Sequence, residues 1–165
     1  MERYEIVSKG PDETMAVARA LAPVFRPGDM ILLDGQLAAG KTTFVKAVAA
    51  ARGSADVVTS PTFTLANFYS TPTDTILHID AYRLSGVPEF RDLALDDYFE
   101  STVTFIEWGA FVAKEFPEHL AIRFDVEPGD DVRRTLAFSA DGLRWSAALP
   151  AVLAKWPQRR GKATT

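Results

Sequence analysis

The sequence lacks cysteine altogether and contains no apolar run long enough to span a membrane. The absence of cysteine excludes disulfide bonds and cysteine-ligated metal sites, and it suits the reducing cytoplasm. The first residues, Met-Glu-Arg-Tyr-Glu, are polar and do not form the apolar centre of a secretory signal. We therefore expect a cytoplasmic protein that does not contact a membrane.

A strong charge of one sign is also missing. The 165 residues carry a net charge of -4, with 24% charged and 47% hydrophobic residues, as in ordinary globular domains. This charge does not direct the protein to nucleic acid. The length suffices for one domain, which we place at residues 1–157. Residues 158–165 are polar and basic and are predicted to form a disordered, solvated tail, with RNA contact as the alternative.

What the sequence does contain is a phosphate-loop pattern. Gly35, Gly40, Lys41 and Thr42 match the arrangement G-x-x-x-x-G-K-[ST]. The four apolar residues before it have the length of a buried strand, and the residues from Lys41 onward have helical spacing. A strand, this loop and a helix, in that order, are the context that the motif requires. We therefore predict a nucleotide-binding site here.

Each position of the loop has a physical role. Gly35 and Gly40 let the backbone curl so that successive N–H groups point toward phosphate oxygens. Lys41 supplies a positive charge, Thr42 offers a hydroxyl to Mg²⁺, and Thr43 can reach the α-phosphate. The predicted nucleotide-binding residues are Gly35, Leu37, Ala38, Ala39, Gly40, Lys41, Thr42 and Thr43.

The remaining pattern predicts an α/β fold: a P-loop NTPase-like sandwich with parallel central strands and antiparallel additions. Strands are predicted over residues 3–8, 30–33, 63–69, 75–81, 103–106, 120–126, 134–138 and 143–149, and helices over residues 12–25, from 41 to near 53, and over 88–95. The last strand rests on Asp141-Gly142, which is a two-residue hairpin signal.

Two apolar strands end in a carboxylate: Ile79 precedes Asp80, and Ile106 precedes Glu107. If these strands are parallel neighbours of the phosphate-loop strand, both carboxylates converge on the phosphates. Mg²⁺ prefers oxygen ligands, so Thr42, Asp80 and Glu107 form the predicted metal site. Either carboxylate can instead orient the attacking water, and two unrelated surface acids are the structural alternative.

Four further residues have both functional and structural interpretations. Thr62 lies where many nucleotide hydrolases sense the γ-phosphate, or its hydroxyl satisfies a turn. His78 is a proton carrier or a buried strand residue bonded to backbone. Arg83 contacts phosphate or a protein partner, or forms a surface ion pair. Trp108 covers the site or packs in the core.

Two absences narrow the nucleotide chemistry. The guanine-reading sequence Asn-Lys-x-Asp does not occur, which favours adenine. No arginine-rich lid segment of the kind found in small phosphotransfer kinases occurs either. A small-molecule P-loop kinase with an unrecognised acceptor is therefore the second hypothesis, and a nucleotide-binding module without turnover is the third.

Four motifs in this order resemble the bacterial TsaE family, also called YjeE: GQLAAGKTT at residues 35–43, SPTFTL at 60–65, HIDAYRL at 78–84 and IEW at 106–108. The resemblance runs from about Pro11 to Arg134. It implies a P-loop ATPase, weakly active alone, that uses ATP and Mg²⁺. It also implies partnership with the TsaB–TsaD pair that makes threonylcarbamoyladenosine beside the anticodon of tRNA, with tRNA met only through that complex.

The resemblance also assigns roles to residues. It implies catalytic roles for Thr62, Asp80, Glu107 and Trp108. Residues 60–64 and 78–83 resemble the family's two switches, and Arg134 and the helix start near Asp12 resemble nucleotide contacts. The family usually has Asp in place of Gln36 and Gly in place of Ala38, so the loop geometry is expected to differ here.

Overall fold

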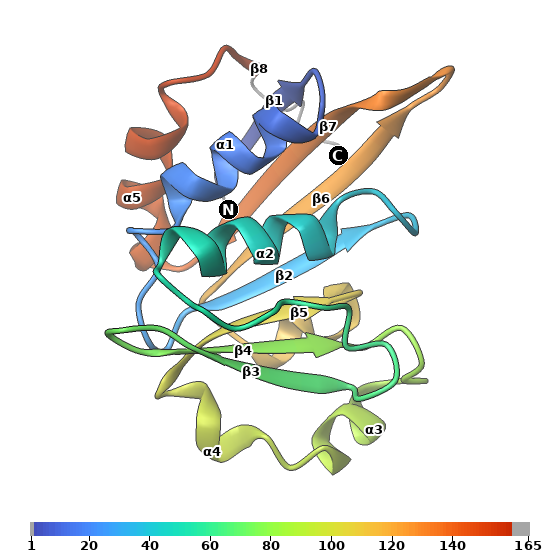
Figure 1. Cartoon of the computed structure of the whole chain (residues 1–165), viewed down its shortest axis with the longest axis vertical. Coiled ribbons are helices and arrows are strands. Elements are labelled where there is room, and N and C mark those ends of the chain that lie inside the picture. Colours follow the sequence, from blue (N-terminus) through green and yellow to red (C-terminus); the bar gives the residue numbers. More distant parts are fainter. Residues whose placement is uncertain (1, 160–165) are drawn as a thin grey trace.

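The computed structural model describes residues 2–159, in which eight strands form one mixed sheet (Figure 1). The order across the sheet is β3-β4-β5-β2-β6-β7-β1-β8. The strands are β1 (Glu2–Ser8), β2 (Met30–Gly35), β3 (Ala66–Ser70), β4 (Thr75–Asp80), β5 (Thr102–Glu107), β6 (His119–Glu127), β7 (Asp130–Asp141) and β8 (Gln158–Arg159). The helices are α1 (Pro11–Leu21), α2 (Lys41–Ala51), α3 (Val87–Asp92), α4 (Asp96–Phe99), the 3-10 helix η1 (Ala110–Glu115) and α5 (Leu143–Leu153).

The centre of the sheet is parallel and its flanks are antiparallel. Strand β2 pairs in parallel with both β5 and β6, and β4 pairs in parallel with β5. Strand β3 is antiparallel to β4, and β6, β7, β1 and β8 are antiparallel to one another in turn. The predicted fold class is therefore confirmed.

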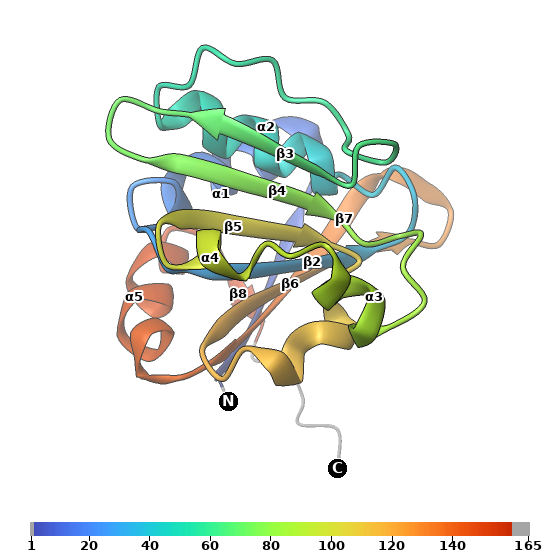
Figure 2. The same cartoon turned by 90° about the horizontal axis from the view of Figure 1, so that it is seen from below.

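Helices cover both faces of the central strands (Figure 2). On one face, α1, α2 and α5 bury a large apolar cluster that contains Phe44 and Trp145. On the other face, α3 and η1 bury a smaller cluster around Phe90 and Val112. Alternate residues of a strand point to opposite faces of the sheet. Because helices cover both faces, β5 is buried along its whole length. None of the helices within residues 2–159 has the length and apolar character needed to cross a bilayer.

The predicted last strand is wrong, because residues 143–153 form the helix α5. Gly142 does turn the chain, with φ of 93°, but no hairpin follows it. Trp145, Leu149 and Leu153 are spaced by four residues, and all three are buried on one side of the helix. Apolar and polar residues also alternate at the start of this stretch, as in a strand. The hydrophobic period alone therefore did not distinguish a strand from a helix.

Two other boundaries differ from the prediction. The strand expected from residue 63 begins only at Ala66, because Leu65 adopts φ of 65° at the end of a turn. The predicted disordered tail is corrected at its first two residues, since Gln158 and Arg159 pair with β1. The remainder of that predicted tail, residues 160–165, lies outside the described residues.

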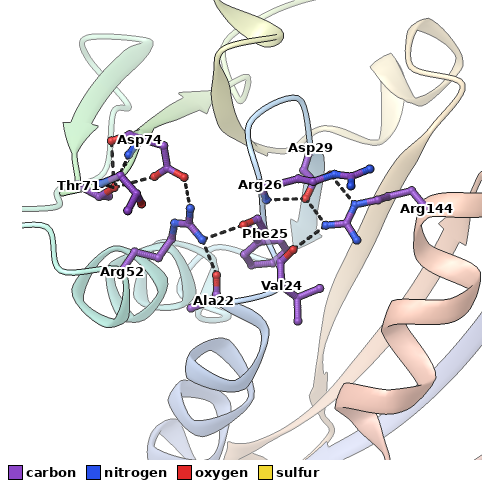
Figure 3. A network of polar contacts seen from close by, with 10 residues as sticks. Ala22, Val24, Phe25, Arg26, Asp29, Arg52, Thr71, Asp74 and Arg144 are labelled. Carbon is purple, nitrogen blue, oxygen red and sulfur yellow. Dashed lines mark hydrogen bonds and ion pairs between the residues drawn. The ribbon is translucent and has the colours of Figure 1, made fainter.

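Two buried ion pairs hold the end of the sheet where β2 begins (Figure 3). Arg52, at the end of α2, pairs with Asp74 in the β3–β4 turn and donates to the Ala22 carbonyl at 2.6 Å. Arg144, on α5, donates to Asp29 at 2.9 Å and to the carbonyl oxygen of Val24 at 2.6 Å. The segment between α1 and β2 is thus tied to the end of α2 and to α5, and through Arg52 to the β3–β4 turn, at the end of β2 opposite the phosphate loop.

Candidate nucleotide-binding site

A cleft of about 430 Å³ lies at the carboxyl ends of β2, β4 and β5. The loop from Gly35 to Gly40 forms one wall. Side chains that follow β4 and β5 form the other. The lining residues are Leu37, Ala38, Ala39, Gly40, Lys41, Thr42, Thr43, Ser60, Thr62, Asp80, Tyr82, Glu107 and Trp108. The structure therefore brings the predicted phosphate-loop, metal and catalytic residues, except Gly35, into one cavity.

Gly35 determines how closely the loop follows the sheet. It adopts φ of 142°, and a Cβ built there would lie 2.5 Å from the Phe124 carbonyl oxygen. No other residue fits without moving β6. Gly40, the last loop residue, adopts φ of 114° immediately before α2, so that the helix N-terminus faces the cleft.

Lys41 is bound by the loop itself. Its ammonium donates to the carbonyl oxygens of Gly35 at 2.6 Å and Gln36 at 2.9 Å. It also lies 4.1 Å from the centroid of the Trp108 ring. Burial lowers the pKa of Lys41, while the negative charge of Glu107 is the strongest influence in the opposite direction. A buried ammonium whose hydrogen bonds go to neutral carbonyl oxygens favours an incoming anion.

The two predicted carboxylates lie side by side. Asp80 and Glu107 are register partners on the parallel strands β4 and β5. Thr42 donates its hydroxyl to Glu107 Oε1 at 2.7 Å, and Thr62 donates to Asp80 Oδ2 at 3.0 Å. The backbone N–H of Tyr82 donates to the other Asp80 oxygen at 2.9 Å. Each carboxylate is thus oriented by a different hydroxyl, one from the phosphate-loop helix and one from the loop before β3.

Glu107 is 3% exposed and remains anionic. Burial alone would raise the pKa of Glu107. The neighbouring His78 imidazole, the hydroxyl of Thr42 and the charge of Lys41 together outweigh burial and hold this pKa below its ordinary value. The oxygens of Thr42, Asp80 and Glu107 are the hard donors that Mg²⁺ prefers. Within residues 2–159 no group of three His, Asp or Glu side chains could hold a metal, so a cation here needs phosphate or water oxygens as well.

Trp108 forms the roof of the cleft. It adopts φ of 60°, and its backbone N–H donates to the Leu33 carbonyl at 2.7 Å, which turns the chain sharply after β5. Its ring contacts both the Lys41 ammonium and the Tyr82 ring, whose centroid is 5.1 Å away. Trp108 is half-buried: it lines the cavity and also packs against the smaller apolar cluster, so it combines parts of both predicted alternatives.

Sequence reasoning missed most of a second, apolar pocket of about 250 Å³ behind the phosphate loop. The start of α1 and the β6–β7 hairpin form it with the loop: Pro11, Thr14, Ala38, Ala39, Gly40, Thr43, Asp131, Val132 and Arg134. Arg134 donates to the Ala39 carbonyl at 3.2 Å and so connects the hairpin to the loop. Only the resemblance pointed to Arg134 and to the helix start, because these segments are far apart in the sequence and share no motif.

The sheet order, the glycine-bounded loop and the polar strand ends define a P-loop protein of the nucleotide-binding class. A family model described as threonylcarbamoyl adenosine biosynthesis protein TsaE matches residues 8–136. The chain belongs to the TsaE family, as its motifs predicted.

Individual relatives agree with this assignment. The tRNA threonylcarbamoyladenosine biosynthesis protein TsaE of Bacillus subtilis is 36% identical over 146 residues, covering 88% of this chain and 90% of the relative. Its counterpart in Streptomyces coelicolor is 39% identical over 144 residues, covering 84% and 97%. The crystal structure of Bacillus subtilis YdiB superposes with a TM-score of 0.77 at 31% identity and covers 93% of this chain and 96% of that one.

Proposed function

We propose that this protein binds ATP with Mg²⁺, hydrolyses it slowly by itself, and assists the complex that makes threonylcarbamoyladenosine in tRNA. The observation that carries the proposal is the meeting of Lys41, Thr42, Asp80 and Glu107 at the carboxyl ends of three parallel strands. This is where ligands bind in open α/β sheets.

The loop and α2 would hold the phosphates. Lys41 would exchange the carbonyl oxygens of Gly35 and Gln36 for phosphate oxygens, and the N–H groups at the start of α2 would donate to the same anion. The apolar pocket beside Thr43, Val132 and Arg134 adjoins the loop and would take the nucleobase. Adenine suits it, because no guanine-reading sequence is present.

Thr42, Glu107 and Asp80 would hold the cation. Bound Mg²⁺ would neutralise charge on the phosphates. Thr42 and Glu107 are hydrogen-bonded to each other beside the start of α2. This position supports Thr42 and Glu107 as the residues nearest to the metal. Asp80 is paired with Thr62 instead, which supports a role for these two at the terminal phosphate and its attacking water.

The positions of the arginines explain why the isolated protein would hydrolyse ATP slowly. Within residues 2–159, no arginine lines the cleft. The Arg83 guanidinium lies 4.8 Å from the centroid of the Phe63 ring, and Arg134 is bonded to the Ala39 carbonyl. An arginine aimed at the γ-phosphate is worth about 10³–10⁵ in rate. A site without one binds nucleotide well and hydrolyses it slowly.

Homologues of TsaB and TsaD are the proposed partners, with tRNA contacted only through them. Leu37, Phe63 and Tyr82 are 68%, 84% and 52% exposed, and they belong to the three segments around the cleft. Exposed apolar side chains of this kind are typical of protein interfaces. Because Thr62 and Asp80 connect two of these segments, the γ-phosphate would set the shape of the surface that docks.

Product analysis tests the enzymatic part. Labelled ATP is incubated with the wild type, with Lys41→Ala and with Lys46→Ala, an exposed control on the same helix. We expect slow phosphate release from the wild type and the control, and none from Lys41→Ala. Transfer of the label to a metabolite would favour the kinase hypothesis, and no reaction at all would favour the binding module.

Size-exclusion titration against the TsaB–TsaD pair of the same organism tests the partnership. Binding is expected with a non-hydrolysable ATP analogue and is expected to weaken with ADP, because only the γ-phosphate can engage both switch segments. Equal binding in every nucleotide state would contradict the switch mechanism. Absence of binding in all states would contradict the partnership and leave the ATPase proposal standing.

A further inference from the structure

His78 is a fully buried histidine that the nucleotide site does not account for. It lies on β4 between Tyr69 of β3 and Glu107 of β5, on the same sheet face as Asp80. Its Nδ1 atom is 3.1 Å from the Tyr69 hydroxyl, and its Nε2 atom is 3.3 Å from Glu107 Oε2. Among the described residues, Nε2 has no hydrogen bond of good geometry, so a buried ring nitrogen is aimed at the carboxylate without being satisfied.

The Tyr69 hydroxyl extends this contact to the loop. It lies 3.1 Å from the carbonyl oxygen of Thr59, directly before the segment Ser60–Thr64 that reaches the cleft. Tyr69 is 3% exposed, and burial raises its pKa, so the hydroxyl keeps its hydrogen. The result is a continuous polar chain from the backbone of Thr59, in an exposed loop, to the buried carboxylate of Glu107.

Counting hydrogens shows that the Nε2 atom carries a hydrogen whichever way the Tyr69 hydroxyl points. Tyr69 has one hydroxyl hydrogen, and it goes either to the Thr59 carbonyl or to His78 Nδ1. In both cases a favourable contact with anionic Glu107 requires a hydrogen on Nε2, because a bare Nε2 lone pair would face a negative charge. Nε2–H is therefore a donor directed at Glu107 Oε2, while Thr42 donates to Oε1.

We propose that His78 is a positioning residue that fixes the carboxylate plane of Glu107 and, through Tyr69, couples that plane to the loop at Thr59. The role rests on the proposed ATPase function. With Oε1 accepting from Thr42 and Oε2 facing the His78 ring at 3.3 Å, the carboxylate keeps one orientation toward Thr42 and the phosphates. A displacement of the loop at Thr59 would move Tyr69, then the imidazole, and so alter the carboxylate without any direct contact between loop and carboxylate.

Two substitutions at one position separate positioning from packing. In His78→Gln the side-chain amide nitrogen reaches approximately the place of Nε2 and can still donate to Glu107, whereas in His78→Asn the amide ends near Nδ1 and cannot. We expect His78→Asn to lower kcat for Mg²⁺-dependent ATP hydrolysis about tenfold, as for loss of one hydrogen bond to a charged group. Its affinity for ATP without Mg²⁺ should stay at the wild-type value, and His78→Gln should restore most of kcat.

Tyr69→Phe tests the second half of the chain and keeps the ring that packs in the core. It should lower kcat about threefold and cause no further loss in combination with His78→Asn, because the two residues act in series. Additive losses in the double variant would overturn the coupling to the loop.

The remaining outcomes each decide the proposal. Equal loss of kcat in the Gln and Asn variants, together with lower melting temperatures, would make His78 a packing residue only. Wild-type kcat in His78→Asn would overturn the positioning role and leave the ATPase function intact. A wild-type protein that binds no nucleotide would overturn the ATPase function and this role with it.

Discussion

The ammonium of Lys41 lies 4.1 Å from the centroid of the Trp108 ring, so the loop lysine and the roof of the cleft are in direct contact. The same ammonium is bonded to two loop carbonyls. A phosphate that draws Lys41 toward itself must therefore change the environment of the indole as well.

This contact predicts an optical signal for nucleotide binding. Addition of ATP should change the emission of Trp108, because the cation beside its ring moves. Trp145 is 1% exposed and belongs to the core beneath α5, so it serves as an internal reference. Fluorescence titration of the wild type and Trp108→Phe checks this. A signal of equal size in Trp108→Phe would show that the change arises elsewhere.

Asp80 and Glu107 are predicted to matter more for the metal than for the nucleotide. Asp80→Asn and Glu107→Gln keep the size of each side chain and remove its charge. We expect each to raise the Mg²⁺ concentration needed for half-maximal hydrolysis at least tenfold, while affinity for ATP in the absence of Mg²⁺ stays equal or rises. Asp97→Asn on α4, an exposed acid, is the control. A normal Mg²⁺ dependence in either variant would remove that residue from the metal site.

Glu107 should make stability depend on pH in acid. Its pKa is lower in the folded protein than the ordinary value of 4.5, so unfolding in acid takes up a proton. The stabilisation is present above about pH 4.5 and is lost as the pH falls through the lower folded-state pKa. Urea unfolding at neutral and acidic pH should show a steeper acid loss for the wild type than for Glu107→Gln. Parallel pH profiles would contradict the assigned charge state.

The ion pair between Arg144 and Asp29 should contribute far more than a surface pair. Both side chains are largely buried, at 13% and 5% exposed, so removal of one leaves the other charge without compensation. We expect Asp29→Ala to lower the free energy of unfolding by about 3 kcal/mol. Asp125→Ala breaks the exposed pair with Arg123 and should cost less than about 1 kcal/mol. Equal effects in denaturant titrations would contradict this account.

The parts of the fold that follow from local chemistry were predictable from the sequence. Gly35, Gly40 and Lys41 mark the loop, and an apolar run that ends in Asp80 or Glu107 identifies a strand and its functional end. The helix α5 was missed because its first residues fit period 2 as well as period 3.6. The short strand β8 was missed because two polar residues carry no pattern of their own, and only the edge of β1 makes them a strand.

Contacts between distant segments explain what was missed in the site. Val132 lies beside Pro11 only because β7 returns next to β1. The series of polar contacts from Thr59 through Tyr69 and His78 to Glu107 runs across the three neighbouring strands β3, β4 and β5. Nothing in the residue order indicates it, since each member on its own resembles an ordinary strand or loop residue.

The site is assembled from parts of unequal local stability. Asp80 and Glu107 belong to interior strands whose amides are bonded on both sides, whereas Ser60 and Thr62 belong to a loop with few backbone bonds. Amide hydrogens of β4 and β5 should therefore exchange with solvent only through global unfolding, and those of residues 57–64 through small local openings. Under the proposed function, the strand half of the site would keep its geometry through each nucleotide cycle, while the loop half would be reordered each time. Substitutions in the loop would consequently change how long the ATP-bound state lasts, without disturbing the carboxylates of Asp80 and Glu107.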